Sequence, residues 1–317
     1  MTTSCVRVNA VLFREKQLDK QHLRLLLNGK SAARADVRAA VEAVRSIGHD
    51  VSVRVTYEPG DIPRLVSEAL RDHEQIDTLV SGGGDGTLNE VVDAALHEVG
   101  EDEKLPFAFA VLPLGTANDF ASQICLDPDD IPSCLRFAAE AEARPTDIGK
   151  VNGCVFVNMA TGGFGTRVTS ETDPNLKKVL GGAAYLFTGL QRFSELAACE
   201  GRIKAEDFTW EGAFLALAVG NGQRAGGGIR LCPKARLDDG FLDLTILPFP
   251  SSGRAIDLLT MLLEGGAEGL NSALIERKVR NITIQTQESV QFNLDGEPMN
   301  GQSWNIGIQH HRIDFRR

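Results

Sequence analysis

The sequence predicts two domains: an N-terminal α/β domain built on a parallel sheet, and a C-terminal antiparallel β-sandwich. The chain has 317 residues, which is long for a single hydrophobic core. Up to about residue 142, apolar strand-like runs alternate with segments of helical periodicity, an order typical of parallel sheets with right-handed crossovers. From residue 146 onward, short β-like runs with Gly, Asn and Asp turns dominate, which favours a sandwich. We place the domains at 1–147 and 148–305.

The elements of the first domain follow from apolar periodicity and from the positions of Gly and Pro. They are, in order, a strand at 23–28, a helix at 32–44 closed by Gly48, a strand at 51–55, a helix at 65–70, a strand at 76–80, a helix from 91, a strand at 107–112 and a helix at 131–142. Residues 1–22 match no pattern and are expected to form a short extra strand or a loose tail.

A glycine-rich stretch, Ser81–Glu90 (SGGGDGTLNE), lies between the third strand and the following helix. Its four glycines leave backbone N–H groups bare, and the helix behind adds the positive end of its dipole, so phosphate is the expected ligand. Asp85 would repel a bare phosphate. It is therefore expected either to order the amides of the loop or to act through a bound cation.

The stretch differs from the two commonest nucleotide signatures. Asn89 replaces the third glycine of G-x-G-x-x-G, and the P-loop pattern does not occur. A βα turn without a ligand explains a lone run of glycines equally well. The polar residues Thr87, Asn89 and Glu90 at the start of the helix favour contact with sugar, phosphate or metal.

Ligands of parallel sheets gather at the carboxyl ends of the strands. Lys30, Thr56, 82–90 and 114–118 all follow predicted strands, so we expect them at one edge of the sheet. In the last of these loops, Thr116, Asn118 and Asp119 offer a hydroxyl, an amide and a carboxylate to a phosphate tail or to helix capping, and capping is the simpler role for Asp119.

The second domain contains several strand-like runs and turns. The runs are 154–159, 214–219, 241–247, 279–285, 290–294 and 304–308, with helical segments near 176–196 and 255–263. Segments 237–241 and 295–298 are typical of tight turns, and 221–228 is either a flexible rim or a long hairpin loop. A stripe at helical spacing (Leu186, Phe187, Leu190, Phe193) is more typical of core than of a lid.

Composition excludes several classes of protein. A formal net charge of −10 argues against nucleic acid as a partner and against strong attraction to anionic membranes. The six cysteines show neither a C-x-x-C pair nor zinc-like spacing, and H-E-x-x-H and G-x-S-x-G do not occur. No signal peptide or membrane span is recognisable. We therefore expect a cytoplasmic protein with reduced thiols.

These motifs together resemble the diacylglycerol kinase catalytic-domain superfamily, and most closely the bacterial YegS-type lipid kinases. The resemblance rests on SGGGDGTLNE at 81–90, LPLGTANDFA at 112–121 and NLDGEP at 293–298, supported by LNGK at 27–30, NMATGGFG at 158–165 and GNG at 220–222. The matches run in family order from about residue 25 to residue 301. The resemblance implies a phosphofructokinase/NAD-kinase-like first domain, which the C-terminal residues 306–317 rejoin.

The resemblance implies an ATP-dependent kinase that phosphorylates the hydroxyl of a lipid such as diacylglycerol or phosphatidylglycerol. The ATP-binding positions that match are Thr56, Gly84, Asp85, Gly86, Thr87, Leu88, Asn89, Glu90 and Thr116. Phosphoryl transfer needs the phosphates held, their charge neutralised by a divalent ion, and the acceptor hydroxyl aligned near a base. Contact with the membrane is expected to be peripheral and transient, at its inner face.

Two turns of the second domain gain roles from the resemblance. Glu297, which spacing alone would leave as a solvated turn residue, matches the proposed proton acceptor. Beside Asp295, in a cleft dried by lipid, its proton affinity could be raised. Arg236, Asp239 and Phe241 match a structural site for Mg²⁺ or Ca²⁺, to which Asp239 gives its carboxylate and the other two give main-chain oxygens.

Two other functions remain open from the sequence. An NAD kinase shares a G-G-D-G-T loop, although Asn89-Glu90 and the segment 113–120 fit the lipid-kinase pattern better. A nucleotide-binding module with the same fold would bind ATP without transferring its phosphate.

Overall fold

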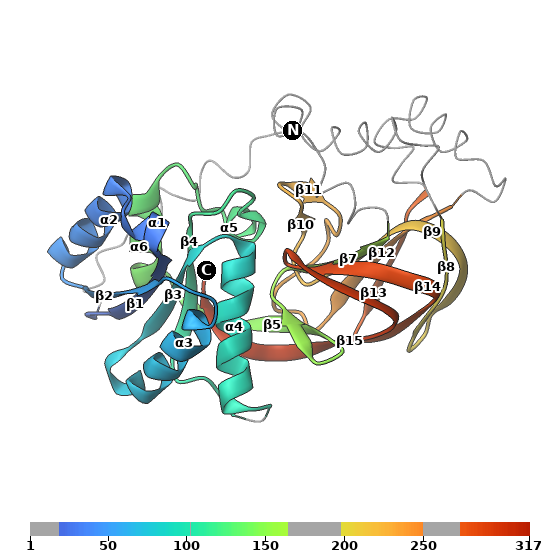
Figure 1. Cartoon of the computed structure of the whole chain (residues 1–317), viewed down its shortest axis with the longest axis horizontal. Coiled ribbons are helices and arrows are strands. Elements are labelled where there is room, and N and C mark those ends of the chain that lie inside the picture. Colours follow the sequence, from blue (N-terminus) through green and yellow to red (C-terminus); the bar gives the residue numbers. More distant parts are fainter. Residues whose placement is uncertain (1–18, 102, 164–197, 250–272) are drawn as a thin grey trace. The chain divides into compact units, whose positions relative to one another are not determined.

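The computed structural model describes residues 19–101, 103–163, 198–249 and 273–317, which fall in two compact units (Figure 1). Unit 1 comprises Met1–Arg144 and Ile313–Arg317, and unit 2 comprises Pro145–Arg312. The helical segments predicted near 176–196 and 255–263, with the stripe that contains Leu186, lie outside the described residues, as do residues 1–18.

Unit 1 is built on a parallel sheet. Strands β1 (His22–Asn28), β2 (Asp50–Thr56), β3 (Thr78–Gly83) and β4 (Ala108–Pro113) lie in the order β4-β3-β1-β2. The last strand of the chain, β15 (Glu297–Arg316), adds Phe315 in parallel beside Phe109 of β4. Arg316 fixes this end by donating to Thr78 Oγ1 at 3.1 Å and to the Ala141 carbonyl at 2.8 Å.

Helices cover both faces of the unit 1 sheet, as period-two alternation along β1 requires. Leu23, Leu25 and Leu27 pack on one face, in a core shared with α2 (Ala35–Ser46) and α6 (Ile131–Glu140). Arg24 points to the other face and donates to Asp72 Oδ2 at 2.9 Å, at the end of α3 (Asp61–Arg71). Helix α4 (Asp85–Val99) packs against α3 (Figure 1).

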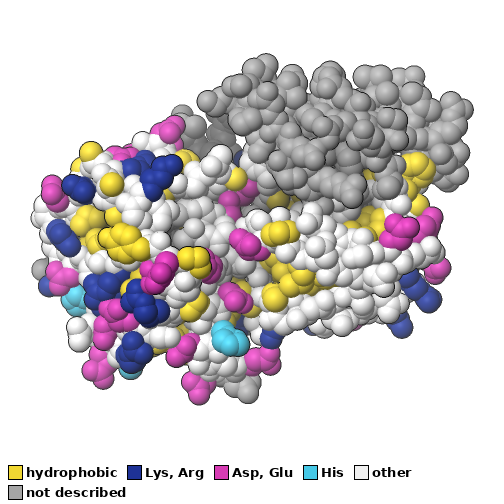
Figure 2. Space-filling view, viewed as in Figure 1, with side chains coloured by type: hydrophobic (Ala, Val, Ile, Leu, Met, Phe, Trp, Pro, Cys, Tyr) yellow, Lys and Arg dark blue, Asp and Glu magenta, His cyan; other side chains and the backbone are white. Residues whose placement is uncertain are grey.

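Short elements complete unit 1. They are α1 (Gly29–Ala32), the 3₁₀ turn η1 (His73–Gln75) and α5 (Asp119–Gln123). Over the face of unit 1 seen in Figure 2, Lys and Arg side chains are interspersed with Asp and Glu, without a continuous basic surface among the described residues.

Unit 2 is dominated by strands. They are β5 (Ala143–Val151), β6 (Cys154–Phe156), β7 (Met159–Gly163), β8 (Cys199–Ala205), β9 (Thr209–Gly220), β10 (Arg224–Ala225), β11 (Ile229–Arg230), β12 (Leu242–Pro248), β13 (Ile275–Val279), β14 (Asn281–Leu294) and most of β15. The long strands β9 and β14 each pair antiparallel with both β7 and β8. Phe214, Phe292 and Trp304 lie fully buried in the core between them. The chain is thus mixed α/β with a β-rich C-terminal part, as the sequence predicted.

Asp61, the first residue of α3, ties the loop after β2 to the helix. Its carboxylate accepts hydrogen bonds from Tyr57 N at 2.8 Å, Arg64 Nη2 at 2.6 Å and Glu58 N at 3.3 Å. These bonds, led by that from Tyr57 N, lower the pKa of Asp61 from 3.8 to about 2. Because this pKa is depressed in the folded state, the stabilisation is present above 3.8 and is lost as the pH falls through about 2.

We therefore expect Asp61→Asn to lower the free energy of unfolding at neutral pH, because an amide accepts these hydrogen bonds more weakly than a carboxylate. The difference between the variant and the wild type should shrink as the pH falls from 3.8 toward about 2. Urea unfolding at a series of pH values measures it. A difference that does not change with pH would contradict this account of Asp61.

Candidate functional site

The carboxyl ends of the unit 1 strands lie at one edge of the sheet, as the sequence predicted. Asn28 pairs with Thr56 across β1 and β2, and Leu27 with Gly82 across β1 and β3. Gly83 and Pro113, the last residues of β3 and β4, are also register partners. The segments that leave this edge carry every residue predicted to contact ATP. Thr56 is half-buried there, and Thr116 is exposed.

The glycine stretch differs from the predicted ten-residue loop. Strand β3 continues to Gly83 and α4 begins at Asp85, so Gly84 alone connects them. A Cβ on Gly82 would lie 2.4 Å from Leu27 Cδ2, and one on Gly83 would lie 2.5 Å from Thr87 Oγ1. These two glycines therefore serve close packing. The same shift places Leu88 inside α4 with its side chain 1% exposed.

Gly84 and Gly115 bring two turns into backbone contact. A Cβ on Gly115 would lie 2.4 Å from Gly84 Cα, and one on Gly84 would lie 3.2 Å from Gly115 Cα. The turn at Gly115 is itself held by Asn118, which accepts from Gly115 N at 2.9 Å and donates to the Gly115 carbonyl at 2.8 Å. The turns after β3 and β4 thus form one connected backbone surface.

Asp85 caps a helix other than its own. Its two carboxylate oxygens accept from Asp119 N at 3.0 Å and Phe120 N at 2.9 Å, the first amides of α5. Asn118, the N-cap residue of α5, has φ 51° and makes no side-chain cap bond. Asp119, which the sequence predicted as a capping residue, is the first residue of α5 and follows the N-cap residue Asn118, and Asp85 supplies the acceptor for its amide. Asp85 was predicted to order the amides of its own loop or to act through a cation; the amides that it orders are instead those of Asp119 and Phe120 in α5.

The N-terminal part of α4 offers polar groups to a ligand. The first amides of any α-helix have no partner within it, and they concentrate positive potential. Asn89, 8% exposed, has a buried Oδ1 without a hydrogen-bond partner among the described residues. Leaving such an acceptor unsatisfied costs about 1–3 kcal/mol, so a donor from a ligand would stabilise it.

In unit 2, Glu297 begins β15 beside a two-residue hairpin turn. Leu294 pairs with Glu297, and the intervening Asp295 and Gly296 have φ 49° and 111°, as a type I′ turn requires. The Glu297 side chain is exposed. The predicted hairpin is confirmed.

Asp295 anchors this hairpin to a distant segment. Its buried carboxylate accepts from Val157 N at 2.6 Å, Met159 N at 2.7 Å and Asn158 N at 3.1 Å. Asn221 supports the same segment, because its side-chain amide donates to the Val157 carbonyl at 2.7 Å. Sequence analysis gave neither residue this role. The Asp-Gly turn was visible in the sequence, but its partners lie more than 130 residues away.

The stretch 221–228, which the sequence left as a rim or a hairpin loop, contains a small hairpin. Strand β10 pairs antiparallel with β11, and Gly226, Gly227 and Gly228 between them all have positive φ. The hairpin interpretation is confirmed.

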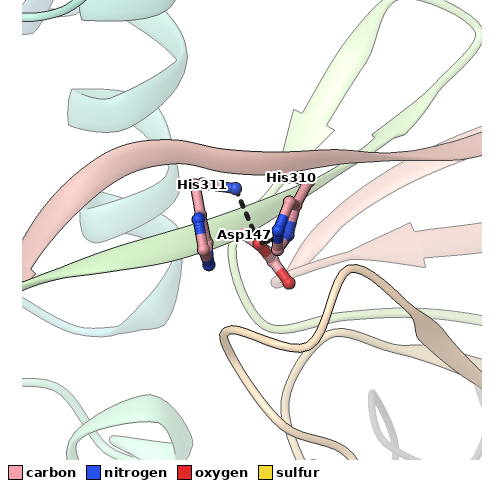
Figure 3. A group of neighbouring side chains, drawn as sticks. All are labelled: Asp147, His310 and His311. Carbon is pink, nitrogen blue, oxygen red and sulfur yellow. Dashed lines mark hydrogen bonds and ion pairs between the residues drawn. The ribbon is translucent and has the colours of Figure 1, made fainter.

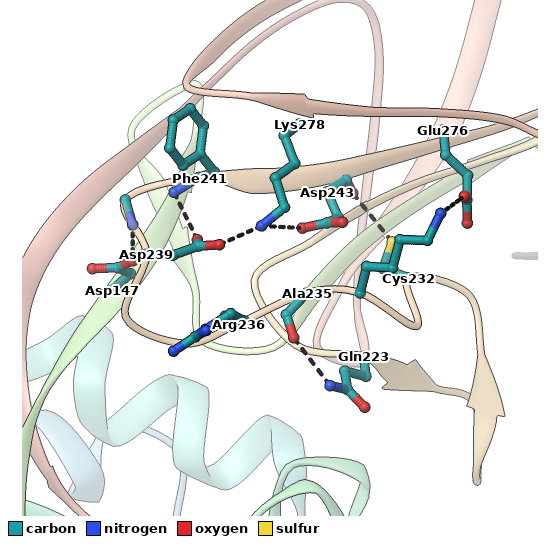
Figure 4. Close-up of polar contacts among 12 residues, drawn as sticks. Asp147, Gln223, Cys232, Ala235, Arg236, Asp239, Phe241, Asp243, Glu276 and Lys278 are labelled. Carbon is teal, nitrogen blue, oxygen red and sulfur yellow. Dashed lines mark hydrogen bonds and ion pairs between the residues drawn. The ribbon is translucent and has the colours of Figure 1, made fainter.

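The predicted metal loop, 236–241, is a turn held by carboxylates (Figure 4). Asp239 accepts from Phe241 N at 3.2 Å and from the Lys278 ammonium. The Arg236 side chain is exposed and lies 3.5 Å from Asp238. The metal ligands expected here are a carboxylate oxygen and main-chain carbonyl oxygens, a set that suits Mg²⁺ or Ca²⁺.

Sequence analysis missed Asp243 and Lys278 beside this loop. Burial raises the pKa of Asp243 to about 6, Lys278 opposes the rise, and the charges of Asp239 and Glu276 add to it. Apolar and polar residues alternate in β12, and a polar residue in such a pattern is expected to face solvent. The sequence therefore gave no sign that Asp243 is buried.

Asp147 holds the backbone of the same loop in place (Figure 3). Its fully buried carboxylate accepts from Gly240 N at 2.7 Å, His311 N at 2.7 Å and His310 Nδ1 at 2.8 Å. The imidazoles of His310 and His311 stack with centroids 3.6 Å apart. These three side chains are close enough to hold a metal ion. The carboxylate already accepts three hydrogen bonds, however, so the cluster acts as a backbone clamp.

Comparisons with known proteins agree with this architecture. Residues 22–151 match the diacylglycerol kinase catalytic domain, and residues 158–309 match the YegS C-terminal NAD kinase beta sandwich-like domain. A Pseudomonas aeruginosa protein named "Probable lipid kinase YegS-like" is 49% identical and covers 92% of each chain. One of that name from Xanthomonas axonopodis pv. citri is 43% identical over 90% of this chain and 92% of its own.

A crystal structure of a diacylglycerol kinase from Bacillus anthracis str. Sterne has the same fold. It gives a TM-score of 0.72 with 22% identity and covers 94% of this chain and 97% of its own. Together with the matched catalytic domain, the fold defines a kinase, a phosphotransferase that uses an alcohol group as acceptor. Within that class, the chain belongs to the YegS-like lipid kinases, as its motifs predicted.

In the ranges that the structure describes, no helix has both the length and the apolar character needed to span a bilayer.

The contact between Gly84 and Gly115 leads to a prediction. Gly115→Ala would place a methyl group 2.4 Å from Gly84 Cα, so one of the two turns must move. We expect the free energy of unfolding to fall by about 1–3 kcal/mol, measured by urea unfolding. Gly29→Ala is the matched control, because the nearest atom to its new methyl group would be Tyr57 Cε1 at an ordinary 3.5 Å. Equal stability of both variants would disprove the close contact.

Proposed function

We propose that this enzyme transfers the γ-phosphoryl group of ATP to a hydroxyl of a membrane lipid of the phosphatidylglycerol or diacylglycerol kind, in a Mg²⁺-dependent reaction. The observation that supports this most is the connected edge of unit 1, where Gly84 meets Gly115 and Asp85 caps α5. Such an edge presents backbone amides and a helix N-terminus, which suit the phosphates of a nucleotide.

The nucleotide is held, in this proposal, by Thr56, Gly84, Asp85, Gly86, Thr87, Leu88, Asn89, Glu90 and Thr116. Leu88 contributes through its main chain, because its side chain is buried. Asn89 Oδ1, which has no hydrogen-bond partner in the part of the chain that the structure describes, would accept from a donor of the nucleotide. Thr56 and Thr116 flank the edge with hydroxyl groups. Asp85 acts mainly by holding the two turns in place.

Glu297 is the proposed general base that accepts the proton of the lipid hydroxyl. Its exposure allows a substrate to reach it, and the bonds from Asp295 to the amides of Val157, Asn158 and Met159 fix the hairpin that carries it. Arg236, Asp239 and Phe241 are proposed to hold Mg²⁺ or Ca²⁺ as a structural ion. When bound, that ion would neutralise carboxylate charge and stiffen the loop 236–241.

The proposed site of action is the cytoplasm, with transient peripheral contact at the inner face of the membrane. A formal net charge of −10 disfavours lasting adsorption to anionic lipid, so binding of the headgroup itself must supply much of the affinity.

The function is tested by incubating the protein with γ-labelled ATP, Mg²⁺ and separated bacterial lipid classes, with NAD as a parallel acceptor. We expect label in a single lipid class that carries a free hydroxyl. Label only in NAD would replace the lipid kinase with an NAD kinase. Saturable ATP binding without transfer to any acceptor would instead indicate a nucleotide-binding module.

The role of Glu297 is tested by Glu297→Gln, which keeps the size of the side chain and removes its basicity. We expect turnover to fall by roughly 10²–10⁴-fold with unchanged ATP binding, because a general base acts on the chemical step. Glu288→Gln, which alters another exposed glutamate of the same hairpin, should retain full turnover. Turnover of Glu297→Gln equal to that of the wild type would exclude this residue as the base.

A further inference from the structure

Two carboxylates share a single lysine beside the loop 236–241 (Figure 4). The Lys278 ammonium forms an ion pair with Asp239 and lies 3.9 Å from Asp243 Oδ2. Asp243 is 8% exposed, and its buried Oδ2 has no hydrogen-bond partner among the described residues. The Asp243 carboxylate therefore lies near the Lys278 ammonium and is attracted by its charge, but the two groups are too far apart to form a hydrogen bond.

The charges around this cluster do not balance. Asp239 and Asp243 bring two negative charges, and Lys278 brings one positive charge. The neighbouring ion pair of Lys234 and Glu276 is neutral by itself, at 2.5 Å. Arg236 lies beside Asp238, and Arg280 lies over the Phe241 ring at 4.7 Å, so neither forms an ion pair with Asp239 or Asp243. The side chains of Asp239, Asp243 and Lys278 together carry a net charge of −1, and a divalent ion in place of the ammonium would bring this charge to zero.

Lys278 can leave this position when another cation takes its place. Its side chain is 42% exposed, against 20% for Asp239 and 11% for Asp243. A long side chain with an ammonium group at its tip can swing into water and be fully hydrated there. The two carboxylates, which are far less exposed, cannot follow it, so they remain to ligate another cation.

We propose that Lys278 is a built-in competitor for the divalent ion of this loop, and that Asp243 joins Asp239 as a ligand once the lysine has left. This inference rests on the ion site proposed above at Arg236, Asp239 and Phe241. Without the ion, Lys278 holds the two carboxylates together. With the ion, oxygen ligands from Asp239 and Asp243 bind the metal, and the ammonium is released to solvent. The tethered ammonium thus weakens ion binding and sets the concentration at which the loop takes up its ion.

The test uses the full-length protein freed of ions by a chelator, and titrates it calorimetrically with Ca²⁺ and, separately, with Mg²⁺. Lys278→Met should bind the ion on the order of tenfold more tightly than the wild type, because a competing charge near two carboxylates is gone. Asp243→Asn should bind it on the order of tenfold more weakly. Lys204→Met, which removes an exposed lysine of β8, is the control for net charge and should leave the affinity unchanged.

Thermal unfolding gives a second readout. Lys278→Met should melt below the wild type in chelator, because two carboxylates then lack a partner, and the added ion should raise its melting temperature more than that of the wild type. Lys278→Gln should behave likewise if Lys278→Met does not fold. Equal or weaker ion binding after loss of Lys278, or unchanged binding in Asp243→Asn, would overturn the proposal.

Asp239→Ala separates this proposal from the one on which it rests. Saturable ion binding that disappears in Asp239→Ala but is unaffected by Lys278→Met would retain the ion site and reject the competition. Ion binding by Asp239→Ala equal to that of the wild type would reject the ion site itself, and the competition with it.

Discussion

Hydrogen bonds from main-chain amides to aspartate carboxylates fix the turns that carry the candidate site residues of this protein. Asp85 receives two amides from the start of α5, Asp295 receives those of Val157, Asn158 and Met159, and Asp147 receives those of Gly240 and His311. A hydrogen bond to a charged group contributes about 1.5–3 kcal/mol, and a carboxylate can accept several. Each aspartate thereby fixes the backbone of a turn.

This arrangement divides the acidic residues into two kinds. Asp85, Asp147 and Asp295 are occupied with the backbone, whereas Glu297 is exposed at the start of a strand. An acidic residue inside a glycine-rich segment that is proposed to bind phosphate is otherwise unexpected. The difficulty disappears for Asp85, because its charge is taken up by the amides of Asp119 and Phe120.

Much of the fold followed from apolar periodicity, since the strands at the unit 1 core are continuous apolar runs and the helices between them are amphipathic. The ends of elements followed less well. The run of glycines predicts a loop that bares its amides to phosphate, but Gly82 and Gly83 belong to β3, where they pair with β1 and β4 and where Leu27 and Thr87 leave no room for a side chain. The glycines are visible in the sequence, but the neighbouring residues that decide whether they lie in a strand or in a loop are visible only in the structure.

The site could be predicted only as far as local motifs reach. The hairpin at Asp295 and Gly296 was visible because the turn type demands those residues. Its anchor was not, because Val157 to Met159 carry no side-chain signal: they contribute bare amides. The same holds for Asp85 and α5. Asp243 was missed for another reason, namely that a polar residue in an alternating strand is normally solvent-exposed, whereas here it is buried beside Asp239.

A kinase gains more from positioned groups than from reactive ones, which accounts for this use of carboxylates. Phosphoryl transfer proceeds through a loose transition state, so the protein mainly holds phosphates, neutralises charge and aligns the acceptor. Backbone amides fixed in advance need no reorganisation when negative charge develops, and buried aspartates are an effective means of fixing them. On this argument, the proposed base Glu297 depends on Asp295 for its place in the structure. Asp85 is important for the same reason, because it holds the amides of α5 in place without needing to touch the nucleotide.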